Sequence, residues 1–413
     1  MNFILKISPE FWSFLICFSL LISCHTENES STATETTTST TKDYFPEKVK
    51  VQHAKNFTVS YHNNYKVVRT SATLGDWGSA MPEVEDLEDV MVLVQKGTTA
   101  PALTGDLEGA TIITIPTDQK IATNYPGIET WLEMLGLSEN IVAIGGTKTY
   151  DDVLRNKLLN DEIGEVGYSW AAPPNMEVLL GRQPDIFLMV LSQIRFGGSL
   201  PKLRQLDVPA VPVFDWAERD YLGRAEWIKY CALFFNKEQK ANEIFEEIEE
   251  RVSSLKALAT TAESKPVCLW GHFVDGGFWM ANANNTEARL LKDAGVINPV
   301  EDFTLPFNPV GEPFTNEEWL EVGKDAEHWI ISNGVMGVRL PSKRYLTGFE
   351  AWQNGNLYHQ YLRSKPEHDA YDWFNLGPVR PDFILADLIA LLHPELLPEH
   401  DFVFFGELEK EEL

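Results

Sequence analysis

The residues from Asn236 to Ala259 predict one long helix, and no other stretch of the chain constrains the fold as strongly. Charged residues cover one face of this stretch, and no Gly or Pro interrupts it. Asn236 is suited to cap the helix by accepting hydrogen bonds from the first backbone N–H groups. The apolar residues recur every three or four positions, as on one buried stripe: Ala241, Ile244, Phe245, Ile248, Val252, Leu255 and Leu258. At 1.5 Å per residue the helix is about 35 Å long, so we expect a stiff strut between two larger parts of the chain.

The size and charge of the chain limit its partners. It has 413 residues, 44% of them hydrophobic, which is enough for two or three domains with cores. Its formal net charge of −27 repels nucleic acid and anionic membrane surfaces. The 4 cysteines are too few for a disulfide framework, and Cys231 and Cys268 are expected to be buried thiols, although a bridge between them stays open.

The N-terminus has the features of an export signal followed by a tether. Residues 11–22 form a short apolar run that is typical of a signal-peptide core. The run ends in Leu-Ile-Ser-Cys, which resembles the bacterial lipobox, so residues 1–24 are predicted to be a signal peptide with Cys24 lipidated. Residues 25–42 are almost entirely polar and predict a disordered tether. A signal anchor with Cys24 unmodified is the alternative.

Strands alternate with helices on both sides of the predicted strut. In the first half, residues 43–235, two predicted strands flank a predicted hairpin turn at 62–64, and later predicted strands at 141–144, 186–190 and 211–214 alternate with helices. In the second half, residues 261–413, the same order returns around strands at 267–270 and 328–331. This alternation favours largely parallel sheets covered by helices. The sequence therefore predicts an α/β protein of two Rossmann-like lobes joined by one long rigid helix at 236–260.

Ligands of such sheets bind beyond the carboxyl ends of the strands, and the predicted strand-end loops are rich in aromatic residues. Aromatic walls with a few directed polar groups suit a large planar or chelated ligand. Arginine in such a place suits bidentate contact with ligand oxygens. The candidate ligand-binding residues are Tyr125, Tyr168, Trp170, Arg195 and Trp216 in the first half, and His272, Phe273, Trp279, Tyr371, Trp373 and Arg380 in the second.

Four segments together resemble the helical-backbone class (class III) of substrate-binding proteins of ABC importers. They are Tyr125–Ile144, Asn175–Asp185, the pair Leu222–Trp227 and Asn236–Glu243, and Gly377–Leu388 followed by His-Pro-Glu. The resemblance covers nearly the whole chain after the tether. It implies two lobes bridged by one helix, with modest closure on ligand. It also implies that one glutamate on each lobe forms salt bridges with the permease, and by position these are Glu177 and Glu318, with Glu317 as an alternative.

The function expected from this resemblance is that of a solute receptor rather than an enzyme. We expect a monomeric lipoprotein, held at a membrane only by its lipid, that needs no cofactor, binds an iron(III)–siderophore-type chelate and delivers it to an ABC permease and ATPase complex. Haem or cobalamin is an alternative ligand. A bare metal ion, with His62, His272 and His359 as candidate ligands, is a further alternative, and a non-transport surface lipoprotein is another. No nucleophile elbow, phosphate loop or Cys-x-x-Cys motif supports catalysis.

Overall fold

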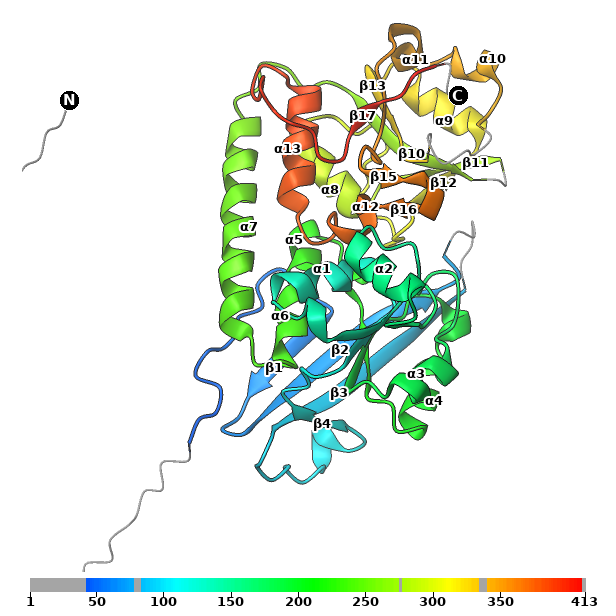
Figure 1. The fold of residues 1–413 in the computed structure, drawn as a ribbon. Helices are drawn as coiled ribbons and strands as arrows, with labels where there is room; N and C mark the ends of the chain where they lie inside the picture. The colour runs from blue at the N-terminus through cyan, green and yellow to red at the C-terminus, as the bar shows by residue number, and fades with distance from the viewer. Residues whose placement is uncertain (1–41, 78–82, 275–276, 334–339, 411–413) are drawn as a thin grey trace, which may run out of the picture. The chain divides into compact units, whose positions relative to one another are not determined.

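The computed structural model describes residues 42–77, 83–274, 277–333 and 340–410 (Figure 1). The predicted strut is present as α7, an unbroken helix over Glu238–Ala259. Its buried stripe includes Phe245, Ile248 and Val252, and α13 (Pro381–Leu392) packs along it. The predicted signal peptide, Cys24 and nearly all of the predicted tether lie outside the described residues. Among the described helices, none is both long and apolar enough to cross a membrane.

The first lobe contains a five-stranded parallel sheet with the order β7-β6-β5-β8-β9. Every residue of β8 is buried, as expected for a parallel strand covered on both faces. The strands are β5 (Ile121–Thr123), β6 (Ile141–Ile144), β7 (Gly164–Glu165), β8 (Ile186–Val190) and β9 (Ala210–Val213). Its helices are α1 (Pro126–Met134), α2 (Asp152–Leu159), α3 (Met176–Arg182), α4 (Ser199–Gln205), α5 (Tyr221–Ala225) and α6 (Trp227–Leu233).

A separate four-stranded sheet precedes the parallel one. It has the order β1-β2-β3-β4, formed by β1 (Phe57–Tyr61), β2 (Tyr65–Gly75), β3 (Val84–Gln95) and β4 (Thr111–Ile115). The predicted hairpin at 62–64 is confirmed, since β1 and β2 pair antiparallel across it. β2 and β3 run antiparallel over their whole length, whereas β4 joins β3 in parallel.

The second lobe holds a six-stranded sheet with the order β12-β11-β10-β13-β14-β17. The central pairs β10–β13 and β13–β14 are parallel, and the outer pairs are antiparallel. Its strands are β10 (Cys268–Val274), β11 (Phe278–Ala281), β12 (Glu312–Phe314), β13 (His328–Ile331), β14 (Leu357–His359) and β17 (Gly406–Glu407). Besides α13, its helices are α8 (Thr286–Asp293), α9 (Asn316–Gly323), α10 (Lys343–Leu346), α11 (Glu350–Asn354) and α12 (Asp372–Asn375), and β15 (Ser364–Lys365) pairs with β16 (Ala370–Tyr371).

Residues 42–413 form one compact unit. One hydrophobic core includes residues of the parallel sheet, of α7 and of α13, and a second core fills the outer part of the second lobe. Cys231 and Cys268 are both free and buried, and burial raises the pKa of each thiol. The open question of a bridge between them is therefore answered in the negative.

The start of α7 differs from the sequence prediction. Lys237 rather than Asn236 occupies the N-cap position, and no side chain caps the helix there. Asn236 lies in the left-handed region at φ 52°, and its side-chain oxygen accepts a hydrogen bond from the ammonium of Lys66 at 2.9 Å. Lys66 also forms a fully buried ion pair with Glu238 of the first helical turn. The predicted cap is wrong because the side chain of Asn236 instead accepts a hydrogen bond from Lys66.

Three buried carboxylates fix the two ends of the described chain. Glu226 accepts hydrogen bonds from the backbone N–H groups of residues 52–54, and Glu218 accepts those of Lys55 and Asn56. Asp387 of α13 does the same for residues 403–405. Because each buried carboxylate has several charge-assisted donors, the flanking segments are held as parts of the folded unit.

Candidate ligand-binding site

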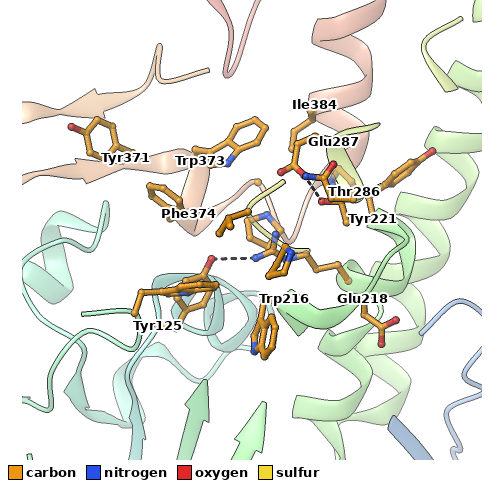
Figure 2. A pocket seen from close by; sticks show the side chains of 18 of the residues that line it. Tyr125, Trp216, Glu218, Tyr221, Thr286, Glu287, Tyr371, Trp373, Phe374 and Ile384 are labelled. Carbon is orange, nitrogen blue, oxygen red and sulfur yellow. Dashed lines mark hydrogen bonds between the residues drawn. The ribbon is translucent and has the colours of Figure 1, made fainter. Parts of the chain in front are cut away.

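A cavity of about 390 Å³ lies between the two lobes, and we call it the main cavity (Figure 2). Both lobes contribute side chains to its wall, and the second lobe contributes more of them. From the first lobe come Tyr125, Lys148, Tyr168, Trp170, Trp216, Glu218, Tyr221 and Arg224. From the second come Asn285, Thr286, Glu287, Leu290, Phe307, Pro309, Val310, Asp369, Tyr371, Trp373, Phe374, Gly377, Pro378, Pro381 and Ile384.

The parallel sheet explains how the first-lobe residues meet. Tyr125 follows β5 and precedes the Pro that opens α1. Lys148 follows β6, Tyr168 follows β7 and Trp216 follows β9. Because the carboxyl ends of parallel strands share one edge of the sheet, residues far apart in sequence line one wall.

Aromatic rings form much of that wall. The rings of Tyr125 and Tyr168 lie 6.3 Å apart, and those of Trp170 and Trp216 lie 6.1 Å apart, edge to face. On the second lobe, Tyr371 packs edge to face on Phe374 at 6.3 Å. Rings in these tilted arrangements hold one another in place, so the wall is largely formed before any ligand arrives.

The main directed polar group of the first lobe is Arg224 of α5. Its Nε donates to the buried carboxylate of Asp215 at 3.0 Å, and its Nη2 donates to the hydroxyl of Tyr125 at 3.3 Å. Burial raises the pKa of Tyr125 to about 12, so the phenol keeps its proton. Burial lowers the pKa of Arg224, but the charges of Tyr125, Asp215 and Glu287 outweigh it and raise that pKa. The guanidinium is therefore a fixed positive group with further donors available to a ligand.

Two more charged groups of the wall are held by partners outside the cavity or across it. Lys148 of the first lobe forms an ion pair with Asp369 of the second. Glu218 accepts hydrogen bonds from the backbone of residues 55–56 and from the indole of Trp227. Burial is the largest influence on the pKa of Glu218 and raises it.

Glu287 lies on the second-lobe wall in the first turn of α8. The hydroxyl of Thr286 donates to one of its carboxylate oxygens at 2.8 Å. Figure 2 shows Thr286 and Glu287 on the opposite side of the cavity from Tyr125 and Trp216. The two lobes therefore present a guanidinium on one side and a carboxylate on the other.

A second cavity of about 780 Å³, which we call the side cavity, adjoins the main one and shares Trp216 and Phe307 with it. Its wall includes the ends of β2 and β3, among them Asp86 and Glu88, and residues 306–308 and 312–313 of the second lobe. The four-stranded sheet therefore extends the space available beside the main cavity.

The structure places six of the eleven predicted ligand-binding residues on the wall of the main cavity: Tyr125, Tyr168, Trp170, Trp216, Tyr371 and Trp373. Their part in binding stays a prediction. The other five, which do not line it, are Arg195, His272, Phe273, Trp279 and Arg380.

Three of those five lie in a hairpin rather than in a strand-end loop. The chain reverses direction after β10, and β11 pairs antiparallel with β10. His272, Phe273 and Trp279 are therefore residues of the sheet. Trp279 is fully buried and stacks on Trp319 at 5.5 Å. Burial lowers the pKa of His272 to about 4. These three residues lie in paired strands and not in a strand-end loop, and their part in ligand binding stays a prediction.

The two predicted arginines, Arg195 and Arg380, contact Phe196 and Asp382 respectively, which do not line the main cavity. Arg380 forms an ion pair with Asp382 at 2.7 Å, and its guanidinium lies over the ring of Phe383. Arg195 is exposed, and its guanidinium lies over the ring of Phe196. The sequence assigned directed polar contacts to these two residues, whereas Arg224, which lines the cavity, was taken only as part of a helix. Glu287 was overlooked in the same way, although it opens the helix after a strand.

The two glutamates expected at the permease differ in their surroundings. Glu177 is exposed in the first turn of α3, where Asn175 provides the cap. Glu318 completes a capping box with Thr315, accepting from its backbone N–H and its hydroxyl at 2.9 Å each. These hydrogen bonds lower the pKa of Glu318. Glu317 is also exposed, and the hydrogen bonds and ion pairs of the described residues do not involve its carboxylate.

The histidines weighed as metal ligands do not meet. His62 stacks on Tyr65, His272 lies in β10 and His359 in β14. Within the part of the chain that the structure describes, no group of three His, Cys, Asp or Glu residues could hold a metal ion.

Two α/β lobes, one connecting helix and an aromatic cavity between them define a solute-binding protein of the helical-backbone class. A family model described as periplasmic binding protein matches residues 121–360. The chain belongs to this family, and the resemblance seen in the sequence is confirmed. The four-stranded sheet precedes the matched region.

Comparisons with individual proteins agree with this fold. The chain is 26% identical over 264 residues to MJ0878, an uncharacterised lipoprotein of Methanocaldococcus jannaschii, and the match covers 62% of this chain and 59% of that protein. A periplasmic haem-binding protein from Pseudomonas aeruginosa superposes with a TM-score of 0.52 at 17% identity, covering 71% of this chain and 98% of that one. An ABC transporter solute-binding protein from Sulfurospirillum deleyianum gives 0.51 at 15% identity, with 69% and 87% coverage.

Proposed function

We propose that the protein is an extracytoplasmic receptor that binds a metal chelate of the iron(III)–siderophore type in the main cavity and delivers it to an ABC permease. The observation that carries this proposal is the cavity itself. Its volume of about 390 Å³ falls in the range of small-molecule sites. Aromatic rings line it, and a few polar groups are fixed at known places, which is the composition that suits a large ligand with an organic shell.

The supply of wall residues by both lobes also supports a receptor. A ligand held between Trp216 of the first lobe and Trp373 of the second touches both at once. Because α7 and α13 pack against each other beside the lobes, binding would change the lobe spacing only slightly. The permease would then recognise the loaded receptor through small shifts of exposed surface groups.

We propose Glu177 on the first lobe and Glu317 or Glu318 on the second as those surface groups. All three are exposed. Of the two on the second lobe, Glu317 is the better candidate for an intermolecular salt bridge. The Glu318 carboxylate is already engaged in the capping box of α9, and a new partner would have to compete with those hydrogen bonds.

We also propose that Cys24 is lipidated and holds the receptor at a membrane. The short apolar run before Cys24 supports this, as does the name of the M. jannaschii relative, which is called a lipoprotein. Replacement of Cys24 by Ala should release the protein from membranes, and mass spectrometry of the wild-type N-terminal peptide should show the lipid. A membrane-bound C24A variant would contradict the anchor.

A thermal-shift screen tests the ligand proposal. The soluble form, residues 43–413, is heated with ferric siderophores, haemin or cobalamin. The true ligand raises the melting temperature by mass action, by RT ln(1 + [L]/Kd) in free energy. Haemin is included because the P. aeruginosa protein of similar fold is named a haem-binding protein. A screen in which no chelate shifts the melting temperature would contradict a chelate receptor and favour a surface lipoprotein without transport function.

A further inference from the structure

More carboxylates than cations line the main cavity, and the carboxylate in excess is that of Glu287. Two cations line it, Lys148 and Arg224. Lys148 is paired with Asp369, and Arg224 is paired with Asp215 at 3.0 Å. Each cation therefore already has a carboxylate of the protein beside it, so neither is an unpaired positive charge for an anionic ligand.

Glu287 differs from the other carboxylates of the wall. Glu218 is committed to backbone N–H groups and to the Trp227 indole, and Asp369 is committed to Lys148. Glu287 is half-buried, and in the described chain its one hydrogen bond comes from the neutral hydroxyl of Thr286. No cation of the described residues lies within ion-pair distance of it, and Arg224 acts on it only by a longer-range electrostatic interaction.

The side cavity has the same excess of negative charge. Asp86, Glu88 and Glu312 line it, and Arg219 is the basic residue among its described lining. The Arg219 guanidinium lies over the ring of Phe307, 5.7 Å from its centroid, at the boundary of the two cavities. A ligand that reaches from the main cavity towards the side cavity therefore passes from the carboxylate of Glu287 to those of Asp86, Glu88 and Glu312.

We infer that the cleft selects neutral or cationic chelates over anionic ones, and that Glu287 sets this preference by accepting a hydrogen bond from an N–H or ammonium group of the ligand. This inference rests on the proposed function and names its ligand class. A ferric trishydroxamate meets the requirement, because three hydroxamate charges cancel the charge of iron(III). A ferric triscatecholate carries three negative charges, and haem carries two carboxylates, so both are disfavoured next to an unpaired carboxylate in a partly desolvated site.

Matched chelates separate this inference from the proposed function. Calorimetry with residues 43–413 compares a linear ferric trishydroxamate that has a terminal ammonium group with its N-acetylated form, which differs chiefly by that charge. A ferric triscatecholate serves as the anionic probe. Cobalamin and its monocarboxylate derivative provide a second pair. We expect the ammonium form to bind about tenfold more tightly than the acetylated one, and both at least tenfold more tightly than the triscatecholate. The cobalamin with the added carboxylate should bind more weakly than its parent.

The variant Glu287→Gln identifies the residue responsible. It should reduce the preference for the ammonium form about tenfold and weaken the rejection of the triscatecholate. Glu246→Gln is the matched control, because Glu246 is exposed on α7, away from the cavity lining, and changes the net charge equally. Equal affinity for anionic and neutral chelates, or affinity ratios in Glu287→Gln that equal those of the wild type, overturns the inference while leaving a chelate receptor. Absence of binding by every chelate overturns the proposed function and this inference with it.

Discussion

Asn375 of the second lobe accepts a hydrogen bond from the backbone N–H of Tyr150 in the first lobe at 2.9 Å. Its amide nitrogen donates to the carbonyl of Pro126 at 3.4 Å. Beside it, Lys365 donates to the carbonyl of Tyr150 and pairs with Asp152, each at 2.8 Å. The lobes are thus joined not only by α7 but also by direct polar contacts at the cleft, and these contacts restrict how far the cleft opens.

Replacement of Asn375 by Ala should lower the free energy of unfolding by about 1–3 kcal/mol, because it leaves the part-buried N–H of Tyr150 without its acceptor. Urea denaturation measures this change. Asn354→Ala is a suitable control, since Asn354 is exposed at the end of α11, and it should shift stability by less than about 0.5 kcal/mol. Equal stability of the two variants would argue against a structural role for the lobe contact.

Replacement of Lys66 by Met tests the anchor at the start of α7. Lys66 is 0% exposed and Glu238 is 4% exposed, so the variant leaves a buried carboxylate without a cation. We expect a loss of about 3–5 kcal/mol. The double variant Lys66→Met/Glu238→Gln should recover most of the loss, because it removes the uncompensated charge. A single variant as stable as wild type in denaturant unfolding would contradict the buried pair.

Glu129 of α1 predicts a dependence of stability on pH. It is fully buried and accepts a hydrogen bond from Thr149, and burial raises its pKa from 4.5 to about 8. Because the folded state holds this proton more tightly than the unfolded state, the contribution of Glu129 is complete below about pH 4.5 and is lost as the pH rises to about 8. The slope is at most about 1.4 kcal/mol per pH unit.

The variant Glu129→Gln removes this titration. It should be more stable than wild type at pH 8, and the difference should shrink towards pH 5. Urea unfolding at the two pH values measures both quantities. Glu133→Gln is the matched control, because Glu133 lies exposed in the same helix. A Gln variant whose stability relative to wild type does not change with pH would contradict the raised pKa.

The two acidic residues at the start of α9 should separate transport from stability. Glu317→Lys should reduce uptake in cells while ligand affinity and melting temperature stay near wild-type values. Glu318→Lys should lower stability by about 1 kcal/mol, because it removes the capping box. Glu177→Lys should resemble Glu317→Lys. Normal uptake by both Glu177→Lys and Glu317→Lys, or loss of ligand affinity in either, would contradict the proposed permease contacts.

Local pattern was sufficient to locate many of the elements. β6, β8 and β13 begin and end where the sequence indicated, because continuous apolar runs act over short distances. The first-lobe aromatics were placed at one wall for a related reason, since the carboxyl ends of parallel strands lie at a common edge.

Long-range arrangement was not available from the sequence in the same way. Whether the chain after β10 crosses over or turns back is decided by the partners of the strand, so the sequence did not show that His272 and Trp279 lie in paired strands. Arg224 and Glu287 line the cavity only because α5 of the first lobe and α8 of the second lobe each have an end at its wall. The hydrogen bond from Lys66 to Asn236 joins residues that are 170 positions apart in the sequence, so a local pattern could not predict it.

The buried carboxylate of Glu218 limits how far the N-terminal segment of this protein can be removed. It lines the main cavity and at the same time accepts the backbone N–H groups of Lys55 and Asn56. Trimming for expression should therefore stop before the segment at 52–56. A start site after residue 56 would deprive Glu218 and Glu226 of their backbone donors, and the loss at Glu218 would directly affect the wall of the main cavity.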